Sequence, residues 1–104
     1  MDTILQITKR DVIDEIQKET MLSRQEIDNV MNAMGNVLFR FLSRADESQS
    51  VKINLMEGLY LTGEYKPEKI KTNHLTGKVI RTTKKIRPKA SFTRSYCERL
   101  SDTL

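Results

Sequence analysis

The hydrophobic periodicity of this 104-residue chain changes from helical to alternating between Leu42 and Val51. Before that point apolar residues recur every three or four positions, as they do on one face of a helix. After it they alternate with polar residues, which is typical of strands with one buried face. We therefore expect an α+β fold in a single domain, residues 1–104, with a helical part at 1–44, a sheet and arm at 51–92 and a closing helical part at 93–104.

Two helices are expected in the first part. Thr8 and Asp11 have the spacing of a helix N-terminus, and this helix should end near Glu19 or Thr20. Ser23 and Glu26 form a second capping box, and the apolar stripe that follows is wider than one short helix could cover. This surplus predicts a dimer, with interface residues Val30, Met31, Met34, Val37, Leu38, Phe41 and Leu42.

The second part predicts strands and a long hairpin. Residues 51–55 alternate between apolar and polar, and Gly58 and Gly63 then indicate two strands with a tight turn or bulge between them. Asn and Gly within residues 72–77 are turn signals for a hairpin tip, and residues 78–92 are expected to form the return strand. Pro88 would be tolerated only at an edge or a bulge. Ser95–Leu100 should form a short closing helix.

Charge separates the two parts of the chain. Residues 1–63 hold 7 Lys/Arg and 10 Asp/Glu, whereas residues 64–104 hold 11 Lys/Arg and 4 Asp/Glu. Alternation over residues 78–92 places Arg81, Lys85, Arg87 and Lys89 on one face of the return strand. Such a hairpin would bind a polyanion, which from charge alone could be DNA, RNA or an acidic protein. The candidate contacts are Lys66, Lys69, Lys71, Lys78, Arg81, Lys84, Lys85, Arg87 and Lys89.

Other functional classes find little support in the sequence. The single histidine, His74, and the single cysteine, Cys97, offer neither metal-ligand spacing nor a nucleophile–base pair, so no catalysis, cofactor, metal or small-molecule substrate is expected. No apolar run approaches the ~20 residues that span a bilayer, and residues 1–8 lack the pattern of a signal peptide. We therefore expect a cytoplasmic protein with no membrane partner.

Several short motifs, in this order, resemble the bacterial HU and integration host factor family of DNA-bending proteins. Residues 8–16 and 22–26 are similar to the starts of that family's two helices, and residues 51–53 and 58–60 to its first strand and the turn after it. Residues 73–77, Asn-His-Leu-Thr-Gly, stand where the family has Asn-Pro-x-Thr-Gly. The resemblance covers the chain from Ile7 to about Leu100.

This resemblance implies an intertwined homodimer, a three-stranded saddle and two arms that wrap the minor groove. It adds the arm tip to the candidate DNA contacts, namely Asn73, His74, Leu75 and Thr76. In that family an apolar wedge at the tip enters a base step and kinks the duplex. Here His74 replaces the family's proline, which leaves Leu75 as the aliphatic candidate for the wedge.

Other departures lie in the sheet and before the last helix. Met56-Glu57 ahead of Gly58 suggests an inserted residue and a bulge, and Gly63-Glu64-Tyr65 replaces basic positions of the saddle strand. Arg94-Ser95 stands where the family has proline-glycine. These departures suggest weaker saddle contacts and a larger share of the affinity in the arm.

The function predicted from the sequence is that of a histone-like, nucleoid-associated protein. It would bind duplex DNA largely without sequence specificity, and it could bend and compact it. The alternative is an HU-fold interaction module of a phage or mobile element that binds an acidic protein or RNA.

Overall fold

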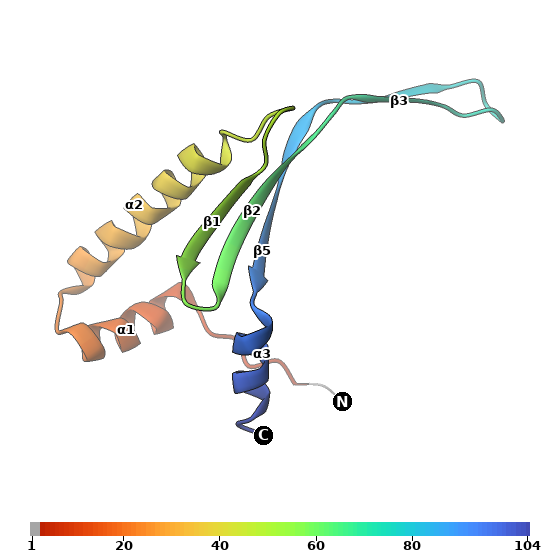
Figure 1. Ribbon diagram of the computed structural model, residues 1–104. Coiled ribbons are helices and arrows are strands. Elements are labelled where there is room, and N and C mark those ends of the chain that lie inside the picture. The colour runs from red at the N-terminus through yellow and green to blue at the C-terminus, as the bar shows by residue number, and fades with distance from the viewer. Residues whose placement is uncertain (1–2) are drawn as a thin grey trace. The chain divides into compact units, whose positions relative to one another are not determined.

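The computed structural model describes residues 3–104 (Figure 1), so Met1 and Asp2, which the predicted domain and the signal-peptide interpretation include, lie outside the described residues. Its contacts form two compact units, one ending at Leu38 and the other spanning Phe39–Leu104. Helices come first, strands second and a short helix last, which confirms the α+β class. The elements are α1 (Lys9–Thr20), α2 (Arg24–Leu42), β1 (Val51–Met56), β2 (Leu59–Lys66), β3 (Lys69–Thr72), β4 (Val79–Thr82), β5 (Lys85–Phe92) and α3 (Arg94–Ser101).

The start of α1 is fixed by the predicted capping box. The Asp11 backbone N–H donates to Thr8 Oγ1 at 3.3 Å, and the Thr8 backbone N–H donates to the Asp11 carboxylate at 3.0 Å. These two bonds satisfy donors that the first turn of a helix leaves free. The helix ends at Thr20, as predicted, and the chain turns at Met21, whose φ of 62° is left-handed.

Helices α1 and α2 pack through a small apolar contact with ion pairs around it. Ile13 and Ile27 are 5% and 3% exposed. The Lys9 ammonium lies 3.1 Å from the Asp28 carboxylate, and Arg24 pairs with Asp14. Ser23 Oγ accepts from the Glu26 backbone N–H at 3.1 Å, which confirms Ser23 as the cap of α2.

A single copy of the chain buries few apolar side chains. Among the described residues, Ile13, Ile27 and Ala45 are the buried hydrophobic ones, whereas Val30 is 63% exposed and Phe41 is 41% exposed. A monomeric protein rarely leaves so much of its apolar surface in water. The apolar stripe of α2, which is exposed or only half-buried in a single copy, therefore needs a covering partner.

The three-stranded sheet is antiparallel, in the order β1-β2-β5. The β1–β2 register shifts between Asn54 and Met56, which confirms the predicted bulge, and the turn passes through Gly58 at φ 84°. The side chain of Leu42 packs closely against Gly63. A Cβ atom at this position would lie only 3.1 Å from Leu42 Cδ2, so a larger residue would be crowded. Strand β5 is an edge strand, so Pro88 is tolerated as predicted.

Helix α3 packs on the β1–β2 turn. The rings of Phe92 and Tyr96 stack with their centroids 5.0 Å apart, and the Thr93 backbone N–H donates to the Gly58 carbonyl at 2.9 Å. Thr93 Oγ1 accepts from the Tyr96 backbone N–H and caps the helix. The helix therefore begins at Arg94, one residue before the predicted start, because Thr93 is its N-cap.

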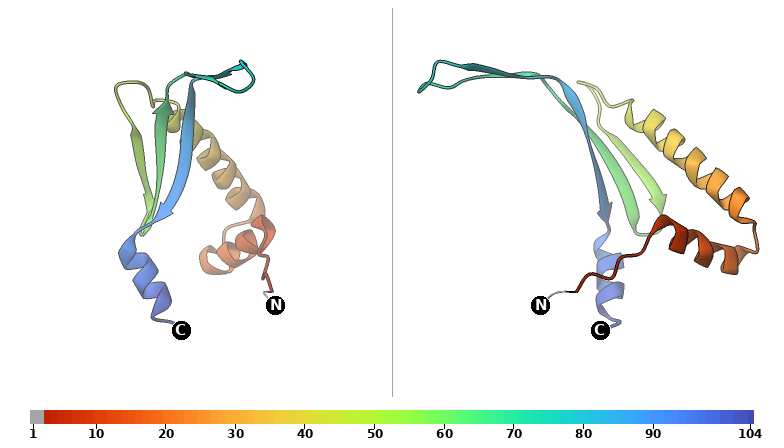
Figure 2. Two further views of the ribbon diagram at one scale, coloured as in Figure 1. Left: turned by 90° about the vertical axis from the view of Figure 1, so that its right-hand side faces the viewer. Right: turned by 180° about the vertical axis from the view of Figure 1, so that it is seen from behind.

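The return strand predicted over residues 78–92 is not continuous, and this corrects the sequence interpretation. It breaks at Thr83–Lys84, opposite a break at Pro67–Glu68, so β3 and β4 form a separate two-stranded sheet. Proline has no N–H to donate to the ladder, which is the physical reason for an interruption at Pro67. Figure 2 shows this hairpin extending beyond the three-stranded sheet and bending away from it.

Candidate nucleic-acid interface

The register of the strands sorts side chains onto two faces of the three-stranded sheet. Directly paired residues of antiparallel strands project to the same side. The pairs Ile53–Leu61 and Leu61–Ala90 belong to an apolar face. The opposite side, which we call the cationic face, carries Lys52, Tyr60, Thr62, Glu64, Lys66, Lys85, Arg87 and Lys89.

Three predicted contacts of β5 lie on the cationic face. Lys85, Arg87 and Lys89 occupy alternate positions of the strand, in agreement with the alternation of the sequence, and each is exposed. Their register partners in β2 are Lys66, Glu64 and Thr62, respectively. The face therefore combines charges from β2 and β5, two strands that are more than 18 residues apart in the chain.

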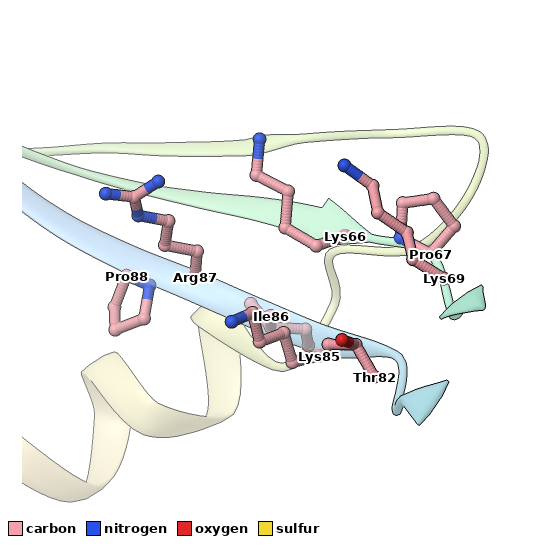
Figure 3. Close-up of a pocket in the computed structure, with 8 residues that line it drawn as sticks. All are labelled: Lys66, Pro67, Lys69, Thr82, Lys85, Ile86, Arg87 and Pro88. Atoms are coloured by element: carbon pink, nitrogen blue, oxygen red, sulfur yellow. The ribbon is translucent and has the colours of Figure 1, made fainter. Parts of the chain in front are cut away.

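We call the hairpin of β3 and β4, with its tip, the arm. At its base, where it joins the β1-β2-β5 sheet, the surface forms a depression. In Figure 3 the side chains of Lys66, Lys69 and Arg87 extend to the same side. Such a convergence of cations from different strands suits the phosphates of a polyanion better than it suits a neutral ligand. The lining residues are Lys66, Pro67, Lys69, Thr82, Lys85, Ile86, Arg87 and Pro88.

The alternation of the sequence placed Arg81 on the cationic face, and the unshifted register agrees with this parity, but Arg81 lies beyond the break that separates β5 from β4. Arg81 lies in β4, directly opposite Ile70, and its Nε is 3.3 Å from the Glu68 carboxylate. The opposing strand decides the composition of a face, and here it contributes an aliphatic side chain and an acid. Both faces of the arm therefore mix cations with aliphatic residues; Lys71, for example, pairs with Ile80.

The tip of the arm is the tight turn that was predicted. The Asn73 side chain accepts from the Leu75 backbone N–H at 2.9 Å, and Gly77 adopts a φ of 70°. The Gly77 backbone N–H donates to the Asn73 carbonyl at 2.7 Å. This turn leaves Leu75 96% exposed, between the exposed side chains of His74 and Thr76.

The remaining predicted contacts are also exposed. Lys69 and Lys71 lie in β3, Lys78 follows the tip, and Lys84 lies in the interruption between β4 and β5.

Lys52 is a candidate contact that the sequence interpretation missed. Its ammonium lies 4.6 Å from the centroid of the Tyr60 ring, on the cationic face. This geometry is a cation–π contact, which orients the lysine while leaving its charge available. The alternation of residues 51–55 already placed Lys52 on the polar side, but only the strand pairing joins it to the arm cations.

Glu64 is an acid within the cationic face. Its pKa is lowered from the ordinary 4.5, first because Lys66 donates a hydrogen bond to it and then because of the positive charges of Lys66, Arg87 and Lys89. The carboxyl is therefore ionised at neutral pH, and it offsets one of the surrounding cations.

Two further observations concern residues 3–104. They contain no group of three or more His, Cys, Asp or Glu that could hold a metal ion. None of their helices is long and apolar enough to cross a membrane.

Comparisons with known proteins agree with this geometry. The sequence profile of the family described as "bacterial DNA-binding protein" matches residues 7–101. A similar solved structure is that of HU from Anabaena crystallised with DNA, with a TM-score of 0.65 and 15% sequence identity, covering 90% of this chain and 97% of that one. No curated protein sequence matches significantly. The structural likeness confirms the HU-like fold.

Proposed function

Because the chain belongs to the bacterial DNA-binding protein family, we propose that its cationic face and its arm together grip the phosphates of duplex DNA. Proteins of this family are architectural DNA-binding proteins and not enzymes. The observation that carries the proposal is the convergence of Lys66, Lys85, Arg87 and Lys89 on one face that leads into an exposed hairpin. Binding through phosphates makes recognition largely independent of sequence.

The functional unit that we propose is a homodimer with two arms at the nucleoid. Dimerisation is a property of the family. The stripe of α2 supplies a surface for it, and the proposed interface is Val30, Met31, Met34, Val37, Leu38, Phe41 and Leu42. Two arms would let one dimer hold a duplex from both sides, and repeated binding along DNA would compact it.

The binding proposal is tested by titrating the protein with duplex DNA, four-way-junction DNA and duplex RNA of equal length over a salt series. We expect affinity to fall steeply with salt and DNA to be preferred, because the minor groove of B-form DNA differs in width and depth from that of A-form RNA. Absence of binding to either DNA at low salt, or a clear preference for RNA, would overturn the proposal.

We also propose that Leu75 is the wedge with which the arm bends DNA. Its 96% exposure at the end of the hairpin leaves the whole side chain available to a base step. In a fluorescence bending assay, Leu75→Ala should lose bending while retaining most of its affinity. His74→Ala is the matched control at the neighbouring position, and bending that depends on His74 but not on Leu75 would refute this assignment.

A further inference from the structure

Two carboxylates lie among the cations where the sheet joins the arm. The Glu64 carboxylate is 3.1 Å from the Lys66 ammonium, and the Glu68 carboxylate is 3.3 Å from Arg81 Nε. Both pairs join residues that belong to the proposed DNA surface or border it. In each pair the cation is one that would otherwise be free to meet a phosphate.

Glu64 acts on more than its direct partner. It lies opposite Arg87 in the register of β2 and β5. Together with Thr62, Arg87 and Lys89 it also lines a small depression on the cationic face. A DNA phosphate that entered this depression would meet two cations and one carboxylate. Glu64 therefore competes with the phosphate for the cations of this depression.

Neither ion pair is needed to hold the strands together. Side-chain exposure is 41% for Lys66 and 57% for Glu64, and 67% for Arg81 and 51% for Glu68. Exposed ion pairs of this kind contribute little to stability. The paired strands are held instead by backbone hydrogen bonds in a register that passes through the break at Pro67 without a shift, since Lys66 pairs with Lys85 and Lys69 with Thr82.

We propose that Glu64 and Glu68 are internal counterions that DNA phosphates must displace from Lys66 and Arg81, and that they thereby limit both the affinity and the salt dependence of binding. The inference rests on the proposed function. When a phosphate takes over the cation, the freed carboxylate attracts a cation from solution. This uptake cancels part of the counterion release that drives binding.

The expected size of the effect follows from simple electrostatics. Removing one unit charge at about 7 Å from a phosphate in water changes binding about threefold. Restoring one full counterion release steepens the plot of log affinity against log salt by up to ~0.9. Neutralising both carboxylates should therefore raise the affinity for DNA about tenfold at low salt.

The experiment compares Glu64→Gln, Glu68→Gln and the double variant with the wild type in duplex-DNA titrations over a salt series. The matched control is Glu57→Gln, which removes the same charge from an exposed carboxylate that lies 3.6 Å from Arg99, in the turn at the far end of β1 and β2. Circular dichroism and sedimentation verify that all variants keep the fold and the oligomeric state. We expect each of the two variants to bind more tightly than the control and with a steeper salt dependence.

Two results would overturn the inference. If Glu64→Gln and Glu68→Gln bind no more tightly than Glu57→Gln while the wild type binds DNA, the internal counterions are refuted and the proposed function stands. If the wild type fails to bind DNA at low salt, both proposals fail together.

Discussion

Neutralising the three β5 cations of the cationic face should reduce the salt dependence of DNA binding by a predictable amount. Lys85, Arg87 and Lys89 lie at alternate positions of one strand. They are therefore spaced by about 6.8 Å, at a rise of ~3.4 Å per residue. This spacing lets each side chain meet a separate phosphate. The perturbation is the triple variant Lys85→Gln/Arg87→Gln/Lys89→Gln.

The magnitude follows from counterion release. Each neutralised phosphate contributes about 0.9 to the slope of log affinity against log salt, so three contacts contribute about 2.7 per subunit, or about 5.4 if both subunits of a dimer engage. Over a salt range from about 50 to 200 mM, a slope difference of 2.7 amounts to about a 40-fold change in relative affinity. The advantage of the wild type should thus be large at low salt and shrink as salt rises.

Fluorescence anisotropy of a labelled duplex measures this slope directly. The control is Lys18→Gln/Arg94→Gln/Arg99→Gln, which removes the same net charge from exposed positions on α1 and α3. The control should lower affinity slightly and leave the slope near that of the wild type. A β5 variant with an unchanged slope, or with the same loss as the control, would refute the assignment of this face to phosphate.

Three further predictions concern stability and assembly. Gly58→Ala should destabilise the protein by about 2 kcal/mol, because a residue at φ 84° costs about 1–2 kcal/mol and the new Cβ would clash with the Tyr96 ring at Cδ2. Thermal unfolding should show a smaller loss for Gly77→Ala, whose φ is also positive at 70° but whose Cβ would meet nothing within 4 Å; equal losses would contradict the packing argument. Asp11→Asn should be less stable than the wild type at neutral pH. The pKa of Asp11 is lowered from 3.8 by the hydrogen bonds of the Thr8 backbone and side chain, so its contribution is present above the unfolded value and is lost as pH falls through the lower folded value. Urea unfolding should therefore show the two proteins converging below pH ~4, and a constant gap would disprove the linkage. Met34→Glu should dissociate the proposed dimer in sedimentation experiments, whereas Asn36→Glu on the same helix should not; a dimeric Met34→Glu protein would place the interface elsewhere.

Features that depend only on neighbouring residues could be predicted from the sequence alone. Caps such as Thr8 and Ser23 act within one helical turn, and the tip turn at residues 73–77 needs only its own side chains and a glycine. The bulge before Gly58 and the edge position of Pro88 follow in the same way from the special backbone of glycine and proline. For this reason the order, type and approximate bounds of the elements were predictable.

Which side chains share a face, in contrast, depends on how the strands pair in the folded protein. The alternation of residues 78–92 described one strand correctly over Lys85–Lys89, but it could not show that Pro67 interrupts the hairpin or that Arg81 faces Ile70 and pairs with Glu68. Strand pairing also brought Lys52 and Glu64 onto the cationic face. The physical reason is that register joins residues far apart in the chain, and the electrostatics of a face is the sum over all its strands.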